Sequence, residues 1–196
     1  DHLLRSHLEN RYGKNAVPAE MTIADFPVTY AELEPYYDHF EKLCGISGKA
    51  GNLRGTKVEG GNVFEGPRQN EYPNKPLAMT IRGELMQKAS KELGYHPFQA
   101  PAANMSEAYT NTEGLTLGAC EYCGHCERFG CEANAKASPH STILPVLTAD
   151  KNFELRPYAY VKELVYDKQA KKVKAVRYVD TRSGEEFEQP AQLVLL

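Results

Sequence analysis

The chain has 196 residues, of which 41% are hydrophobic and 25% charged, with a formal net charge of −3. That length is enough for one substantial core, or for a core with a smaller appended unit. Lys and Arg form no run that could serve as a phosphate-binding stripe, and no apolar stretch approaches the roughly 20 residues that span a bilayer. These features exclude nucleic acid as an expected partner and exclude a transmembrane helix.

A helix is predicted within residues 26–48. Thr29 and Glu32 have the spacing of a capping box, and Gly45 can end the helix. The apolar residues of this helix share one face, which comprises Leu33, Tyr37, Phe40 and Cys44. Free cysteine packs as a small hydrophobe, so we expect Cys44 to be a buried structural thiol rather than a further metal ligand.

Residues 48–76 are rich in Gly and Pro and keep no helical or strand period, which predicts a long irregular segment. A lid or binding loop and a mobile surface insertion explain such a segment equally well. A second helix is predicted to begin after Thr80 and to end at Gly94. Its apolar face comprises Ile81, Leu85, Ala89 and Leu93.

The last part of the chain has the composition of β-strands. Residues 153–167, 172–180 and 185–196 are rich in Val, Tyr, Phe and Leu, and Gly184 can supply the positive φ of a hairpin turn. This pattern predicts a β-meander whose final residues, 193–196, form a strand entering a core. Because the chain begins at Asp1 without a methionine and stops in these apolar residues, we expect it to be a piece of a longer protein.

Four of the five cysteines occur within residues 117–138, in the spacing C-x2-C-x2-C-x4-C: Cys120, Cys123, Cys126 and Cys131. The sequence Cys-Gly-His-Cys matches the dithiol motif of disulfide isomerases, but no strand pattern precedes it and the chain has no Trp. Structural zinc usually takes two cysteine pairs separated by about a dozen residues, and disulfides would close very short loops. Ferredoxin-type sequences hold iron–sulfur clusters on C-x2-C-x2-C runs. The spacing favours a cluster, with zinc and disulfides as the alternatives, and His125 is expected to be solvated.

Several stretches together resemble the glucose-methanol-choline (GMC) family of flavin oxidoreductases, in particular its bacterial branch of membrane-linked sugar and gluconate dehydrogenases. The first of these stretches is FPVTYAELEPYY, which is similar to the aromatic-Pro-x-Ser/Thr-Tyr-x-x-Leu-x-Pro-Tyr-Tyr helix of the family. Residues 74–97 resemble the helix that follows the irregular segment, and residues 114–145 resemble the cysteine-bearing segment, with its Lys-x-Ser and Leu-Pro. Residues 152–196 are similar to the meander of the family.

The resemblance implies an α+β fold. Residues 1–150 would supply part of the substrate domain, an antiparallel or mixed sheet with helices that includes the irregular segment 48–76 and the cysteine loop 117–138. Residues 151–196 would be the truncated β-meander of the FAD-binding domain, with the backbone of Val161 against the adenine of FAD. The Gly-x-Gly-x-x-Gly turn would lie before Asp1 and the catalytic His after Leu196, so the chain alone would be inactive.

The activity implied is that of an FAD-dependent dehydrogenase that oxidises a hydroxyl of a sugar, polyol or sugar acid. An iron–sulfur cluster, 3Fe-4S or 4Fe-4S, held by three or all four of Cys120, Cys123, Cys126 and Cys131 would relay electrons from flavin to a cytochrome c. Cytochrome c and a small subunit would be the protein partners, in a periplasm-facing complex that meets the membrane only through them. Tyr109, His140 and residues 48–76 are candidates for substrate recognition. The rival hypothesis is a stand-alone zinc-binding interaction module without enzymatic activity.

Overall fold

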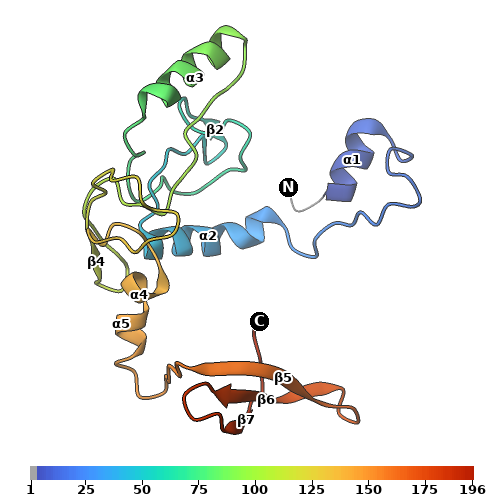
Figure 1. The fold of residues 1–196 in the computed structure, drawn as a ribbon. Coiled ribbons are helices and arrows are strands. Elements are labelled where there is room, and N and C mark those ends of the chain that lie inside the picture. The colour runs from blue at the N-terminus through green and yellow to red at the C-terminus, as the bar shows by residue number, and fades with distance from the viewer. Residues whose placement is uncertain (1–3) are drawn as a thin grey trace. The chain divides into compact units, whose positions relative to one another are not determined.

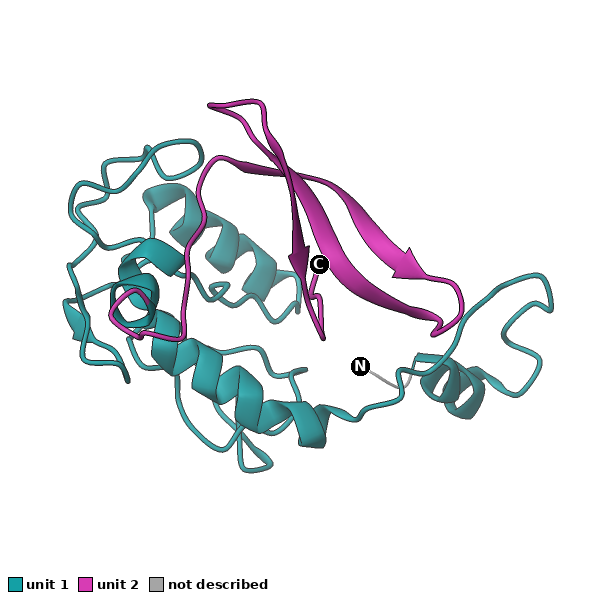
Figure 2. Cartoon of the chain, turned by 90° about the horizontal axis from the view of Figure 1, so that it is seen from below, with its two compact units in different colours: residues 1–147 teal, residues 148–196 magenta. Residues whose placement is uncertain are grey.

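The computed structural model describes residues 4–196, which divide into two compact units, 4–147 and 148–196 (Figure 2). The first unit is helical, with short hairpins (Figure 1). Its elements in chain order are α1 (Leu4–Tyr12), α2 (Tyr30–Cys44), β1 (Asn52–Leu53), β2 (Thr56–Lys57), α3 (Ile81–Glu92), β3 (Tyr109–Thr110), β4 (Thr116–Leu117), α4 (Pro139–Thr142) and α5 (Leu144–Leu147). The second unit is one antiparallel sheet of β5 (Ala159–Asp167), β6 (Lys172–Asp180) and β7 (Glu186–Pro190).

The capping box predicted for α2 is confirmed. The Thr29 hydroxyl accepts a hydrogen bond from the backbone N–H of Glu32, whose carboxylate accepts one from the N–H of Thr29 at 2.7 Å. Gly45 ends the helix in the left-handed conformation, with φ of 64°. Cys44 is buried, as expected, and burial raises the pKa of its thiol.

The apolar face predicted for α2 is only partly correct. Tyr37 and Phe40 are exposed, whereas Glu34 is buried and accepts a hydrogen bond from the N–H of Gln69 at 2.8 Å. The helix therefore packs its acidic side against residues 65–72, because the polar groups of that segment need partners.

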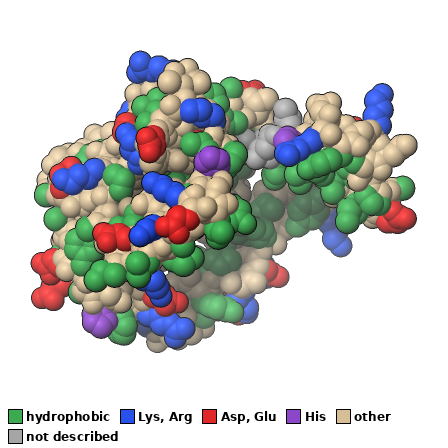
Figure 3. Space-filling view, turned by 90° about the horizontal axis from the view of Figure 1, so that it is seen from above, with side chains coloured by type: hydrophobic (Ala, Val, Ile, Leu, Met, Phe, Trp, Pro, Cys, Tyr) green, Lys and Arg blue, Asp and Glu red, His purple; other side chains and the backbone are tan. Residues whose placement is uncertain are grey.

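The second predicted helix, α3, is also present, with Thr80 as its N-cap. Ile81, Leu85 and Leu93, which were predicted to share one face of this helix, are exposed. Hydrophobic side chains also lie open between charged ones on the face shown in Figure 3. No helix within residues 4–196 has both the length and the apolar character needed to cross a bilayer.

Residues 48–76 are irregular, as predicted, but they form an integral part of the first unit. The Glu65 carboxylate accepts hydrogen bonds from the N–H groups of Gly51 and Asn52, at 2.6 and 3.1 Å. The chain also crosses itself closely, because a Cβ on Gly61 would lie 2.3 Å from the carbonyl carbon of Ala50. Glycine is required at this crossing because no other residue lets two backbones come so near.

The centre of the first unit is built on the extended segment around Met105, which is fully buried. Met105 donates its N–H to the carbonyl of Ala135 and accepts at its own carbonyl from the N–H of Cys120, both at 2.8 Å. Leu117, on the β3–β4 hairpin, and Ala135 are also fully buried. Both ends of the cysteine segment are therefore hydrogen-bonded to the backbone of Met105.

The second unit is a meander with the strand order β5-β6-β7, as the strand pattern predicts. Gly184 has a φ of 76° in the β6–β7 turn, which confirms its predicted role. The prediction of a strand over residues 193–196 is wrong, since β7 ends at Pro190 and Leu193, Leu195 and Leu196 are exposed. One further backbone hydrogen bond follows the strand, from the N–H of Ala191 to the carbonyl of Lys174 at 2.9 Å.

Candidate functional site

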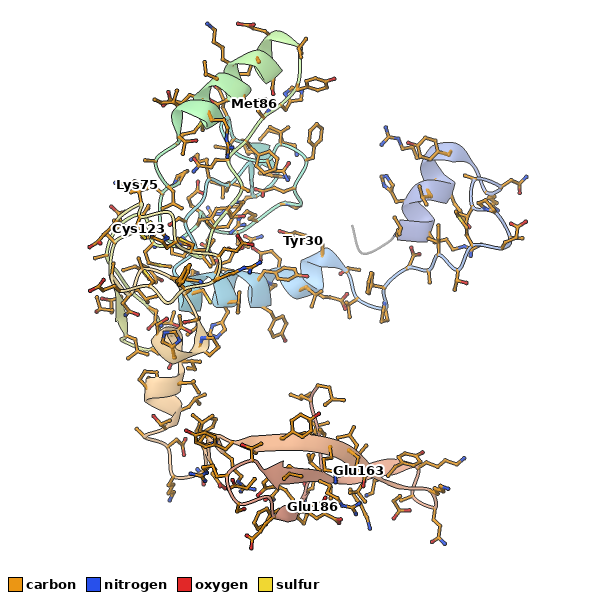
Figure 4. The ribbon with its side chains drawn as sticks, viewed as in Figure 1. Tyr30, Lys75, Met86, Cys123, Glu163 and Glu186 are labelled. Carbon is orange, nitrogen blue, oxygen red and sulfur yellow. The ribbon has the colours of Figure 1, made fainter. Side chains whose placement is uncertain are left out.

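The cysteine segment forms an arm, residues 120–131, in which residues 121–130 are all exposed. Cys120 and Cys131, at the two ends of the arm, are partly buried, whereas Cys123 and Cys126 are exposed within it. Figure 4 shows Cys123 among the loops of the first unit. His125 is exposed, as expected, and its ring packs edge-on against Phe129.

Three of the four arm sulfurs accept hydrogen bonds from nitrogen. Cys120 Sγ accepts from the N–H of Tyr122 at 3.4 Å, and Cys131 Sγ accepts from the N–H of Ala135 at 3.3 Å. The side-chain amide of Asn104 donates to Cys126 Sγ at 3.4 Å. Hydrogen bonds of this kind orient metal-bound thiolates and tune their potential. The donor chemistry of the arm therefore suits a metal centre.

The sulfurs are not placed as the ligands of a metal centre would be. Within residues 4–196, no three His, Cys, Asp or Glu side chains lie close enough together to hold a metal ion. Cys120, Cys123, Cys126 and Cys131 are thus neighbours along the chain that do not form a ready coordination sphere. All five cysteines of the chain are free thiols in the structure.

Two further contacts hold the arm to the unit. Lys136 Nζ donates to the carbonyl oxygens of Cys126 at 2.5 Å and Phe129 at 3.3 Å. The Tyr122 hydroxyl accepts a hydrogen bond from the N–H of Ala78 at 2.8 Å, and Tyr122 itself has a left-handed φ of 56°. A non-glycine residue in that region costs free energy and persists only where its surroundings fix it. The arm is therefore anchored rather than free.

Val161, the residue expected beside adenine, lies in the second unit on the edge strand β5, opposite Tyr178. A β-bulge follows it, between Val161 and Glu163, and its side chain is about half exposed (52%). It lines a cavity of about 330 Å³ that has an apolar floor, which includes Val176 and Tyr178, and a polar rim. An edge strand beside such a cavity can offer both a backbone contact and a flat apolar surface to a heterocycle.

Arg156 also lines that cavity, and hydrogen bonds to its neighbours hold it in place. Arg156 donates to both carboxylate oxygens of Glu154, at 2.8 and 2.7 Å, and to the Tyr178 hydroxyl at 2.9 Å. The hydrogen bonds that Arg156 donates to the Glu154 carboxylate raise the pKa of Arg156 above its ordinary value and lower the pKa of Glu154. Arg156 is therefore a permanent positive charge at the edge of the cavity.

Arg68 is the centre of a buried polar network between α2 and the irregular segment. Its guanidinium pairs with the Glu41 carboxylate, donates to the carbonyl of Asn70 at 3.2 Å and stacks 3.7 Å from the ring centroid of Tyr72. Burial raises the pKa of Glu41 and raises the pKa of Tyr72 to about 12. A cavity of about 170 Å³ lies beside the network, lined partly by Tyr30 and Glu65. The charges of Arg68 and Glu41 satisfy each other, so the network holds the irregular segment against α2.

Two residues considered for substrate recognition have structural contacts. The Tyr109 hydroxyl donates to the carbonyl of Lys42 at 2.8 Å, and burial raises its pKa. His140 is exposed, and its Nδ1 lies 2.9 Å from the Ser138 hydroxyl. These two side chains belong to separate local networks within the first unit.

Some residues of the site were not predicted from the sequence. The contact between Asn104 and Cys126 joins positions 22 residues apart, and no motif marks it. No sequence motif marks Arg68 either. Glu34 and Glu41, however, are seven residues apart on α2 and so share a face. That acidic pair was the one available sign that the helix would bury a cation.

Comparison with known proteins finds no family model that matches the chain. It does find relatives. The chain is 43% identical over 196 residues to a gluconate 2-dehydrogenase flavoprotein of Pantoea cypripedii, an alignment that covers 98% of this chain and 32% of that protein. It is 31% identical over 131 residues to a paromamine 6'-oxidase of Streptomyces fradiae, covering 67% of this chain and 20% of the oxidase.

A third relative, a 2-methyl-1,2-propanediol dehydrogenase of Mycolicibacterium austroafricanum, is 28% identical over 172 residues, which cover 88% of this chain and 28% of that enzyme. The chain thus spans about a third or less of the length of these curated relatives. All three are named as oxidoreductases, and one as a flavoprotein. This chain is therefore homologous to a segment of oxidoreductases, and the gluconate 2-dehydrogenase flavoprotein matches it over nearly its whole length.

Proposed function

We propose that this chain is part of a GMC-type, FAD-dependent dehydrogenase that oxidises a hydroxyl group of a sugar, polyol or sugar acid. The observation that carries the proposal is the 43% identity to a gluconate 2-dehydrogenase flavoprotein across 98% of the chain. Similarity to an oxidase of paromamine and to a dehydrogenase of a diol supports the wider class of hydroxyl donors. We propose an α+β fold of the GMC type, with the second unit as part of the FAD-binding domain.

We propose a supporting role for this chain in that reaction. FAD, when bound, would supply the hydride acceptor. The backbone of Val161 and the apolar floor that includes Tyr178 are the proposed contacts for adenine, because they offer a flat surface at a strand edge. Arg156, fixed by Glu154, would hold the Tyr178 ring in place. The residues that remove the substrate proton are expected outside residues 1–196.

The four arm cysteines are the proposed ligands of an iron–sulfur cluster, which supplies one-electron transfer when bound. Support comes from the sulfur content of the arm and from nitrogen donors to three of its sulfurs. As the cysteines are placed, they do not surround a common centre, so a cluster requires the arm to close. We propose cytochrome c and a small subunit as the partners of the complete enzyme.

The test uses the complete flavoprotein, purified without oxygen together with its flanking sequence. Heat release of FAD, bleaching of the flavin absorbance by gluconate, and analysis of iron and acid-labile sulfide are measured on one preparation. We expect bound FAD that gluconate reduces, and iron with sulfide. A protein without flavin would refute the dehydrogenase. Zinc in place of iron, in a protein that still binds reducible FAD, would refute only the cluster.

A further inference from the structure

We propose that the cleft between α3 and the segment 97–99 is a binding site for a neutral sugar or polyol. The cleft has a volume of about 370 Å³, which lies within the range of small-molecule sites in proteins. The inference concerns binding only and goes beyond the proposed dehydrogenase reaction, because it depends on neither FAD nor a metal. It follows from the shape of the cleft, its unused hydrogen-bonding groups and its lack of charge.

The cleft is formed where one face of α3 lies beside two extended segments, 78–80 and 97–99. Gly83, Gln87 and Ser90 are spaced four and three residues apart and so share that face. A Cβ on Gly83 would lie 2.8 Å from Cγ of Met79. Glycine within a helix is unfavourable relative to alanine, so its place opposite Met79 indicates that a side chain is kept out of this face.

Four polar side chains in the cleft have hydrogen-bonding groups that the fold does not use. Among residues 4–196, nothing hydrogen-bonds to the amide of Gln87 or to the hydroxyl of Ser90. The Gln99 amide donates to the carbonyl of Leu77 at 2.9 Å, which leaves its own carbonyl oxygen as an acceptor. The Thr80 hydroxyl accepts a backbone N–H at 3.2 Å and keeps its proton to donate. Amides and hydroxyls that donate and accept match the hydroxyl groups of a sugar or polyol, which do both.

Much of the remaining wall of the cleft is apolar. Met79, Met86, Pro97 and Phe98 line it, and the Phe98 side chain is 39% exposed. The face of an aromatic ring carries partial negative charge, which attracts the C–H groups of a sugar ring or polyol chain. A cleft with a polar side and an apolar side is therefore complementary to a molecule that carries hydroxyl groups on a carbon skeleton.

The cleft differs in charge from the cavities at Arg156 and Arg68. Among the described residues, those that line it include no Lys, Arg, His, Asp or Glu. The other two cavities are lined by charged pairs, Arg156 with Glu154 and Arg68 with Glu41. A carboxylate or an ammonium group would lose water on entering the cleft without gaining a counter-charge. The cleft is therefore expected to favour a neutral sugar or polyol over a sugar acid or an amino sugar.

Hydrogen bonds fix the segments opposite α3. The Ala78 N–H donates to the Tyr122 hydroxyl at 2.8 Å, and the neighbouring Leu77 carbonyl accepts from the Gln99 amide. The first bond ties the segment 78–80 to the arm, and the second joins the segment 97–99 to the residue before Ala78. Groups that are already held in place lose less entropy when a ligand binds.

The first test is hydrogen exchange, measured by mass spectrometry on the complete flavoprotein with sorbitol, with gluconate or without ligand. We expect sorbitol to slow exchange in peptides from α3 and from residues 97–99, by roughly tenfold at ten times its dissociation constant. Gluconate is expected to leave these peptides unchanged. FAD content and flavin bleaching by gluconate, recorded on the same protein, report separately on the proposed dehydrogenase.

Two results of this measurement would overturn the proposal. No protection by sorbitol, as when another part of the flavoprotein covers the cleft, would refute the site. Equal protection by sorbitol and gluconate would refute its selectivity for neutral ligands. Either result leaves the proposed dehydrogenase standing if the protein still holds FAD that gluconate reduces.

The second test is substitution at Gln87, measured in the same way. Gln87→Leu removes the amide and is expected to weaken sorbitol binding by about two- to tenfold. Gln87→Lys places a cation in the cleft, so gluconate is now expected to slow exchange there. Lys88→Ala is the matched control, because Lys88 is an exposed residue of α3 outside the cleft. It should bind sorbitol as the unmodified protein does, and it corrects for the general stabilisation of proteins by polyols.

The variants are compared only where FAD content and the thermal midpoint show that they are folded. Unchanged sorbitol binding by Gln87→Leu, or a Gln87→Lys variant that gains no effect of gluconate, would overturn the assignment of this cleft. Loss of sorbitol binding in Lys88→Ala as well would show that the effect does not come from the groups that line the cleft.

Discussion

At the scale of single residues, the buried charge of Arg68 is expected to contribute strongly to the stability of the first unit. It is 7% exposed and is the only cation paired with Glu41 among residues 4–196. Replacement by Met in Arg68→Met would leave the Glu41 carboxylate buried without its partner. We expect a loss of about 3–5 kcal/mol in the free energy of unfolding, measured by urea denaturation at pH 7.

The control is Arg177→Met, since Arg177 pairs with Glu163 and Glu188 on the exposed face of the meander. Its effect is expected to be small, because water and salt screen exposed pairs. Equal losses from the two substitutions would contradict a special role for the buried pair.

The effect of Arg68→Met on the free energy of unfolding is expected to depend on pH. Burial already raises the pKa of Glu41, and removal of the Arg68 charge raises it further. A carboxyl whose pKa is higher in the folded state binds protons more strongly there, so folding is favoured as the pH falls. We therefore expect the deficit of Arg68→Met at pH 7 to shrink toward acidic pH. A deficit that stays constant as the pH falls from the folded pKa of Glu41 to its lower, unfolded pKa would show that lost packing, rather than the unpaired charge, dominates.

Gly61 gives a second prediction for a single residue. In Gly61→Ala the new methyl group would lie 2.3 and 2.4 Å from backbone atoms of Ala50 and Gly51, which cannot rotate away. We expect a loss of about 1–3 kcal/mol in the free energy of unfolding. Gly130→Ala is the matched control, because a Cβ there meets nothing within 4 Å. A neutral Gly61→Ala would mean that the two backbone segments can separate at little cost.

At the scale of elements, α2 depends on its capping box. Thr29→Ala removes the hydroxyl that accepts the N–H of Glu32, and an N-cap of this kind contributes about 1 kcal/mol. We expect a loss of that size by urea denaturation, whereas Thr29→Ser, which keeps the hydroxyl, should retain most of the stability. The hydroxyl and the N–H of Thr29 also donate hydrogen bonds to the Glu32 carboxylate and lower its pKa, so the contribution of these two bonds is present at neutral pH and is lost as the pH falls through that pKa. A Thr29→Ser variant as unstable as Thr29→Ala would assign the effect to packing of the methyl group.

The helices also show which parts of the fold the sequence could predict. The ends of α2 and α3 were predictable, because Thr29, Gly45 and Thr80 act on backbone groups within four residues of themselves. What each face meets was not predictable. A helical period shows that Tyr37 and Phe40 share a side, but the burial of Glu34 instead depends on Gln69, 35 residues further along the chain.

The same distinction applies to the cysteine segment. The spacing of the four thiols predicted metal chemistry and treated them as equivalent. Their differences arise from Asn104 and Met105, which lie outside the motif and become its neighbours only when the chain folds. Local patterns thus predict which atoms are available, whereas contacts distant in sequence decide which of them are held in place.

At the scale of the whole molecule, burial is distributed unequally between the two units. The first unit contains Ala50, Met105, Leu117 and Ala135, all fully buried, whereas in the second unit Ala175 is the one buried hydrophobic residue among those described. Every residue of β7 is exposed. Three strands without a covered face are marginally stable on their own, and backbone hydrogen bonds near few buried groups open readily.

We therefore expect hydrogen exchange in a chain of residues 1–196 to be more than about tenfold slower at Ser47 and Met105 than at Phe187 and Glu188. The first pair donate their N–H groups to Ala102 and Ala135 within the buried centre, whereas the second pair lie on the outer strand of the meander. The same measurement on the complete flavoprotein supplies the comparison. Slower exchange of β7 there would show that the rest of the protein covers the meander, as a place in an FAD-binding domain requires. Unchanged, rapid exchange of β7 in the complete protein would argue against that place.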